Sequence, residues 1–178
     1  SQNHQLTFNA AFTNVPGMIA YCTNKALRIV PIVEPCLTTN DPMYGEALTN
    51  LYFVKNNDLS TYVGTNFLGS VSWLDFSIVD TFQWWLRKQT NYLAQFPMEA
   101  IWNDLNEPNE NGMPLNNLFY LDGRYGGGTV TNDTRKWLTV NKNSYSLLNA
   151  SNSYTALKLQ NPSKRPFVLA RSAWPGIQ

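Results

Sequence analysis

Short apolar runs alternate with amphipathic segments along this chain, and that alternation restricts its fold more than any other feature. Residues 27–33 read as a strand buried on both faces, and 98–105 and 166–170 as two more buried strands. Helical spacing of apolar residues covers 15–26, 81–96 and about 139–160, with Asp80 as the expected N-cap of the second helix. Strands that alternate with helices predict a parallel sheet in an α/β fold.

The connecting loops differ in length. The loops after the strands are long, whereas those after the helices, such as 95–99 and 160–166, are short. In (β/α)8 barrels the loops after the strands build the active site. Glu34, Asp104 and Arg171 each stand at the carboxyl end of a predicted strand. A complete barrel typically needs about 250 residues. We therefore expect the central part of a (β/α)8 TIM barrel, with residues 1–178 forming one partial catalytic domain without an internal boundary.

Composition narrows the classes of partner. Only 14% of the residues are charged and the net charge is +1, so neither nucleic acid nor an anionic membrane is an expected partner. No apolar run reaches the roughly 18 residues of a membrane span. The aromatic content of 13% suits either stacking against flat, uncharged ligands or a Trp-rich core. No metal-ligand spacing occurs, so neither a metal nor a cofactor is expected, and Cys22 and Cys36 either pair or remain free thiols.

The segment IWNDLNEP, residues 101–108, carries the most specific chemistry. Side chains alternate along a strand, so Trp102 and Asp104 lean to one side and Asn103 to the other. An ionised carboxylate beside an aromatic wall suits a positively charged transition state, as in glycoside hydrolysis; the alternative is a strand-end Asp that caps the next loop. Arg171, after the last strand, is placed to reach the same mouth and to bind a sugar hydroxyl or a carboxylate there.

WNDLNEP closely resembles the catalytic signature of glycoside hydrolase family 31, the α-glucosidase and α-transglucosylase family, whose usual form is WxDMNEP. Other segments of this chain resemble further landmarks of the family, in the same order and over nearly the whole chain. They are LRIVPIVEP at 27–35, Phe67-Leu68-Gly69, Asp75-Phe76, Trp84-Trp85 and ARSAWPGIQ at 170–178. The chain departs from the family pattern where Leu105 replaces the common Met and Phe67-Leu68 replaces Trp-Pro.

The resemblance implies a retaining α-glycoside hydrolase that acts on neutral α-glucosides or α-glucans. Asp104 would be the nucleophile that forms a covalent glycosyl-enzyme, and Arg171 would bind the sugar at the cleaved bond. The resemblance also implies roles for two further groups of residues. Trp102, Phe67 and Ile32 would line the sugar subsite, and Asn106, Glu107 and Asp75 would support it.

The family's acid/base Asp lies in a WxGD segment that this sequence lacks. We therefore expect the 178 residues alone to be inactive and to need the remainder of the catalytic domain. Three alternatives stay open. The chain could belong to an α-transglucosylase of the same family, to a retaining β-glycosidase that uses Glu107 of the NEP segment as acid/base, or to an inactive carbohydrate-binding remnant.

Overall fold

A three-stranded parallel sheet forms the centre of the computed structural model, which describes residues 4–56, 58–107, 109–110, 113–114, 119–121 and 136–173. Its strands, in the order β1-β6-β11, are β1 (Ile32–Val33), β6 (Ala100–Asn103) and β11 (Phe167–Ala170). The predicted parallel sheet is therefore confirmed. β1 is shorter than predicted, because Pro31 has no N–H with which to extend the ladder toward the start of the chain. The Pro31 carbonyl still accepts a hydrogen bond from Trp102 N, at 2.9 Å.

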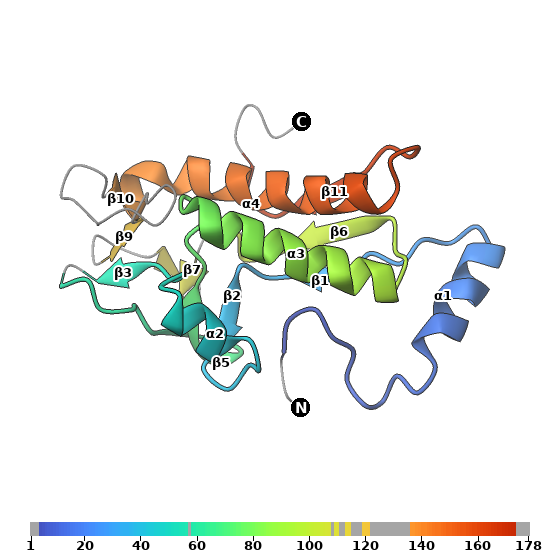
Figure 1. The fold of residues 1–178 in the computed structure, drawn as a ribbon, viewed down its shortest axis with the longest axis horizontal. Coiled ribbons are helices and arrows are strands. Elements are labelled where there is room, and N and C mark those ends of the chain that lie inside the picture. The colour runs from blue at the N-terminus through green and yellow to red at the C-terminus, as the bar shows by residue number, and fades with distance from the viewer. Residues whose placement is uncertain are drawn as a thin grey trace.

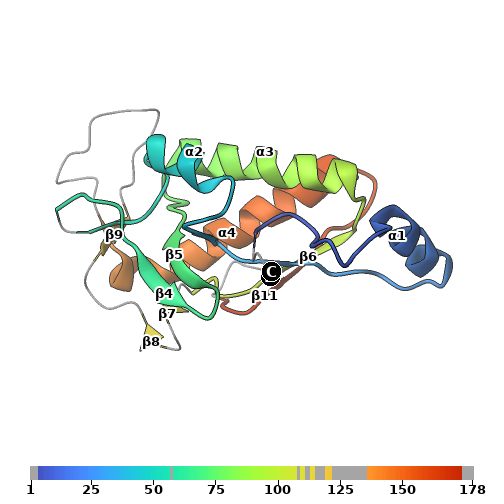
Figure 2. The ribbon, with the colours of Figure 1, turned by 90° about the horizontal axis from the view of Figure 1, so that it is seen from below.

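Two long helices, α3 (Val79–Gln95) and α4 (Leu138–Gln160), lie side by side on one face of this sheet (Figures 1 and 2). Helix α1 (Val15–Asn24) lies apart from them, at the end of the molecule where β6 begins (Figure 1). All three helices were predicted to within two residues at each end. No helix in the described part of the chain is long and apolar enough to cross a membrane.

The expected role of Asp80 as an N-cap is wrong. Helix α3 begins two residues earlier than predicted, at Val79, with Ile78 in the cap position. Asp75 organises the entry instead, because its backbone carbonyl accepts from Ile78 N at 3.1 Å and its carboxylate accepts from Ser77 N at 3.0 Å. Asp80 lies in the first helical turn, where a negative charge interacts favourably with the helix dipole.

The predicted burial of the outer strands on both faces is also wrong. On the face toward the helices, Val33, Ile101 and Asn103 are at most 1% exposed. On the opposite face, Ile32 and Leu169 are 53% and 47% exposed. In a complete barrel this inner face is filled by side chains from the other strands. The described residues cover it only in part.

The long loops after the strands contain small antiparallel sheets that the sequence did not predict. They lie at the end toward which β6 points (Figure 1). One consists of β2 (Cys36–Thr38), β5 (Gly69–Trp73) and β4 (Gly64–Asn66), in that order. Another has the order β10-β9-β3, with β3 (Lys55–Asn56), β9 (Phe119–Leu121) and β10 (Lys136–Trp137). The remaining elements are the pair β7 (Asn109–Glu110) and β8 (Met113–Pro114) and the short helix α2 (Tyr44–Thr49).

Aromatic side chains account for much of the core. Trp73, Trp84, Trp85, Phe53 and Tyr145 are at most 2% exposed, and the rings of Trp84 and Trp85 lie 5.7 Å apart. These side chains support the interpretation of a Trp-rich core, and they are not accessible to a ligand. Phe67 differs, because it is 70% exposed.

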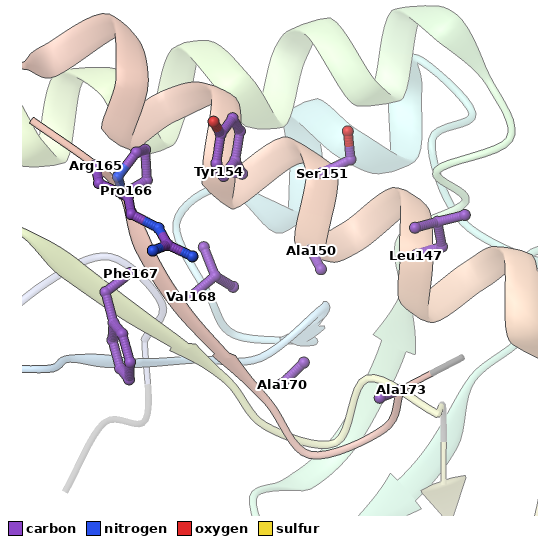
Figure 3. A pocket seen from close by; sticks show the side chains of 10 residues that line it. All are labelled: Leu147, Ala150, Ser151, Tyr154, Arg165, Pro166, Phe167, Val168, Ala170 and Ala173. Carbon is purple, nitrogen blue, oxygen red and sulfur yellow. The ribbon is translucent and has the colours of Figure 1, made fainter. Parts of the chain in front are cut away.

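A groove of about 890 Å³ runs between α4 and the edge strand β11 (Figure 3). Leu147, Ala150 and Tyr154 line it from the helix, and Val168 and Ala170 line it from the strand. Its lining includes no carboxylate. This large groove therefore lacks the chemistry predicted for the site, which lies elsewhere.

Candidate active site

The register of the central sheet brings three strand ends into one row. Val33 and Ala170 are both partners of Asn103, on either side of β6. The next residue of each strand is Glu34, Asp104 or Arg171. Asp104 N donates to the Val33 carbonyl at 3.2 Å and Arg171 N to the Asn103 carbonyl at 3.0 Å, so the ladder extends to this row. The prediction that Asp104 and Arg171 reach the same mouth is confirmed.

The guanidinium of Arg171 contacts two carboxylates. Its Nη1 lies 3.3 Å from Asp104 Oδ1, and its Nη2 donates a hydrogen bond to Glu107 Oε1. The hydrogen bond to Glu107 raises the pKa of Arg171, and the charges of Glu107, Asp104 and Glu34 act in the same direction. Among the described residues Asp104 Oδ1 has no hydrogen-bond donor. The contact between Asp104 Oδ1 and Arg171 Nη1 is therefore an ion pair that lacks the geometry of a hydrogen bond.

The turn that follows Asp104 is tightly held. Leu105 adopts a φ of 51°, in the left-handed region, which costs roughly 1–2 kcal/mol for a residue with a Cβ. Asn106, which is fully buried, offsets this by accepting from Ser172 N at 2.9 Å and donating to the Ser172 carbonyl at 3.4 Å. These two bonds join the loop after β6 to the loop after β11. They keep Asp104 and Arg171 together.

A pocket of about 280 Å³ lies beside this row. Ile32, Phe67 and Asp104 all line it, so the structure brings together two of the three predicted wall residues with the predicted nucleophile. Residues 4–7 and Glu34 also border it. The pocket is smaller than the groove beside β11, but it is the one that holds a carboxylate at a strand end.

The other predicted site residues lie outside this lining. Trp102 is half-buried and pairs in register with Ile32, one layer below Asp104 on the same face of the sheet. Asp75 is fully buried in the turn before α3, where its carboxylate accepts from Ser77 N and Oγ at 3.0 and 2.5 Å. Asp75 therefore holds a helix entry and does not border the pocket.

Glu34 is a site residue to which the sequence assigned no role. Its side chain is 6% exposed, and one of its carboxyl oxygens accepts a long hydrogen bond from Cys36 Sγ at 3.6 Å. Burial raises its pKa to about 7, and the charge of Asp104 adds to this rise, whereas the Cys36 hydrogen bond and Arg171 oppose it. The sequence feature that could have identified Glu34 as a site residue is its position at the end of a strand, which it shares with Asp104 and Arg171.

A buried polar network anchors β6 to the helices behind it. Asn103 Nδ2 donates to Ser153 Oγ at 2.9 Å, and Ser153 Oγ donates to Gln89 Oε1 at 3.0 Å. Gln89 Nε2 donates in turn to Asn152 Oδ1 at 2.7 Å, and Asn152 donates to the Phe82 carbonyl. All four polar side chains are fully buried. Because Asn103 faces the helices, its neighbours Trp102 and Asp104 face the other way.

The described residues contain no group of three or more His, Cys, Asp or Glu side chains that could hold a metal ion. Cys22 and Cys36 are both free thiols, Cys22 half-buried on α1 and Cys36 fully buried.

Comparison with known proteins places these features in a family. The family model of the glycosyl hydrolases family 31 TIM-barrel domain matches residues 1–178. The chain is 30% identical to lysosomal alpha-glucosidase of Bos taurus over 192 residues and 31% identical to alpha-glucosidase 2 of Bacillus thermoamyloliquefaciens over 174 residues. These alignments cover 96% and 94% of this chain, but only 20% and 21% of the two relatives.

Solved structures of glycosyl hydrolases are also similar to this chain. The glucosidase II alpha subunit in its Tris-bound form is similar over 99% of this chain and 19% of its own, with a TM-score of 0.78 and 25% identity. A dextranase of Flavobacterium johnsoniae complexed with glucose shares the fold, with a TM-score of 0.71 at 19% identity over 92% of this chain and 19% of that chain.

Proposed function

Because this chain belongs to glycosyl hydrolase family 31, we propose that it is part of the catalytic barrel of a retaining α-glycoside hydrolase. The proposed substrates are neutral α-glucosides or α-glucans, supported by the names of the relatives, which are alpha-glucosidases. One observation carries the proposal. Asp104 ends the central strand and lines the pocket, and its carboxylate lies 3.3 Å from the Arg171 guanidinium.

The proposed reaction has two displacements. The Asp104 carboxylate attacks the anomeric carbon while the bond to the leaving oxygen breaks, and that oxygen takes a proton from a second carboxyl group. The ionised second group then removes a proton from water, whose oxygen attacks the same carbon and releases Asp104. Retention follows because the sugar is inverted twice.

Arg171 and Glu107 take different parts in this proposal. Arg171 holds Asp104 in place and offers its remaining N–H groups to a sugar hydroxyl. Glu107 pairs with Arg171 and therefore acts as a structural partner of the guanidinium. This pairing argues against the β-glycosidase alternative, in which Glu107 would have to carry the proton to the leaving group.

The second carboxyl group has to lie about 5–5.5 Å from the nucleophile. By the family resemblance it belongs to a segment outside these residues, so the remainder of the catalytic domain is the proposed partner of this chain. The groove beside β11 is the natural place for the next strand and helix, because β11 pairs with β6 alone in the described sheet. On this basis we expect residues 1–178 alone to be inactive.

The test uses the full-length enzyme that contains these residues and 5-fluoro-α-glucosyl fluoride, which traps a glycosyl-enzyme. Mass spectrometry of peptides should locate the label on Asp104 in the unaltered enzyme. Asp104→Asn should abolish labelling, whereas Glu107→Gln, as the matched control, should retain it at a reduced rate. Labelling that persists in Asp104→Asn would show that another residue is the nucleophile.

A further inference from the structure

We propose that Asn66 is a positioning residue of this site. Its side chain closes the turn that carries Phe67 and so holds that ring against the sugar pocket. A ring held in this way adds to the affinity for the sugar without taking part in the chemical step. This inference rests on the proposed function, since it takes the 280 Å³ pocket to be the sugar site.

The turn that carries Phe67 joins β4 to β5 (Figure 2). Asn66 and Gly69 are partners in the antiparallel register, so Phe67 and Leu68 alone form the loop between them. Gly69 adopts a φ of 111°, a conformation that residues with a Cβ rarely adopt. Both loop residues line the pocket. The shape of this turn therefore decides where the aromatic wall lies.

Phe67 has little packing of its own to hold it in place. Its side chain is 70% exposed, whereas the aromatic side chains of the core are almost fully buried. The family pattern has Pro after the aromatic residue at this place, and a proline ring fixes its own backbone φ. Leu68 lacks that restraint but brings a backbone N–H. The turn therefore needs another restraint, and it has a donor for one.

Asn66 supplies this restraint from the first position of the turn. Its Oδ1 accepts a hydrogen bond from Leu68 N at 2.8 Å, which makes an Asx turn around Phe67. From the same amide, Nδ2 donates to the sulfur of Cys36 at 3.7 Å. Asn66 is 5% exposed, and Cys36 is fully buried on β2. The Asn66 side chain therefore ties an exposed turn to the buried core.

The expected magnitude follows from the hydrogen bond that closes the turn. Without it the turn samples other conformations, and only the fraction that presents Phe67 to the pocket binds sugar with full affinity. The apparent dissociation constant rises by the inverse of that fraction. One neutral hydrogen bond changes an equilibrium constant by roughly 2- to 10-fold, so the loss of affinity should lie in that range. Because the ring contacts the sugar before and during the reaction alike, kcat should change by less than about 2-fold.

The experiment compares the full-length enzyme with its Asn66→Ala variant. Glucose serves as a competitive inhibitor of p-nitrophenyl α-glucoside hydrolysis, because its inhibition constant is a binding constant. We expect Asn66→Ala to raise this constant roughly 2- to 10-fold while kcat changes little. Asn66→Ser keeps a neutral acceptor that closes the same kind of turn more weakly, so its inhibition constant should lie between the other two. This variant also keeps the test open if Asn66→Ala does not fold.

Asn9→Ala is the matched control. The side chain of Asn9 accepts from Ala11 N at 2.7 Å, so it closes an Asx turn of the same kind, but Asn9 is exposed and does not line the pocket. The inhibition constant should be unchanged in this variant. An equal loss of affinity in Asn9→Ala, or an unchanged inhibition constant in a folded Asn66→Ala, would overturn the inference.

A double-mutant cycle separates positioning from general stability. Phe67→Ala should raise the inhibition constant at least as much as Asn66→Ala does. If Asn66 acts through the ring, Asn66→Ala should add less than about 2-fold once Phe67 is already alanine. Two effects that multiply independently would show that Asn66 acts by another route. Thermal unfolding is measured on each variant, because a merely structural role would lower Tm and leave the inhibition constant unchanged.

Failure of the proposed function has a different signature. An unaltered enzyme that is neither inhibited by glucose nor labelled on Asp104 by 5-fluoro-α-glucosyl fluoride would refute the assignment of the pocket itself. Where glucose inhibits and Asp104 is labelled, the Asn66 variants test the turn alone.

Discussion

Ser153→Ala tests how firmly the helices hold the strand that carries Asp104. The Ser153 hydroxyl accepts from Asn103 Nδ2 at 2.9 Å and donates to Gln89 Oε1 at 3.0 Å. Alanine removes both bonds without adding volume. The amide of Asn103 and the oxygen of Gln89 each lose a partner in a place that water does not reach, since all three side chains are fully buried.

The magnitude follows from these two losses. A buried polar atom left without a partner costs about 1–3 kcal/mol. Two such atoms should therefore lower the free energy of unfolding of the barrel by roughly 2–6 kcal/mol. For a domain of this size each kcal/mol corresponds to about 2–4 °C in Tm. Asn103 Oδ1 already has no donor among the described residues, so the network has no spare bond with which to compensate.

The assay is thermal unfolding of the full-length enzyme, followed by two spectroscopic probes to establish that the barrel unfolds in one step. Ser144→Ala is the matched control, because Ser144 lies on the same helix but is exposed and does not line the groove beside β11. It should change the free energy of unfolding by no more than about 0.5 kcal/mol. If Ser153→Ala behaves like this control, the network does not support β6 and the reasoning is wrong.

Three further predictions concern charge and loop contacts. The folded chain holds one more proton than the unfolded chain between about pH 4.5 and pH 7, because burial raises the pKa of Glu34 to about 7. Stability should therefore fall as pH rises through that window, by about 3 kcal/mol for this group, and urea titrations of Glu34→Gln should lack that part of the decline. Asn106→Ala removes both hydrogen bonds to Ser172, so kcat/KM should fall roughly 10- to 100-fold. Asn106→Asp keeps only the acceptor and should recover little of this loss. An unchanged kcat/KM in Asn106→Ala would contradict the role of the loop contact. Glu99→Gln breaks exposed ion pairs with Arg28 and Lys164, so its cost should stay below about 1 kcal/mol and diminish in salt, and a larger loss in urea titrations would contradict this estimate.

Local patterns in the sequence determined much of this molecule. Apolar spacing located α1, α3 and α4 to within two residues, because a helix's periodicity is set by neighbours three and four positions away. The alternation of helices and strands predicted the parallel sheet. It also placed Asp104 and Arg171 at one mouth, since all carboxyl ends of a parallel sheet meet at the same edge.

Tertiary structure alone decided which residues share a row, a pocket or a network. The register Val33, Asn103 and Ala170 brings Glu34 level with Asp104, and no local pattern encodes a pairing between strands so far apart. Gln5 reaches Glu34 only through the fold, and its side chain accepts a hydrogen bond from Glu34 N at 3.1 Å. Asp75 and Trp102 have site-like sequence contexts, yet one holds a helix entry and the other lies a layer below the pocket. Sequence periodicity sets which side of an element is apolar, whereas the ionisation of a carboxyl depends on every group that the fold packs around it.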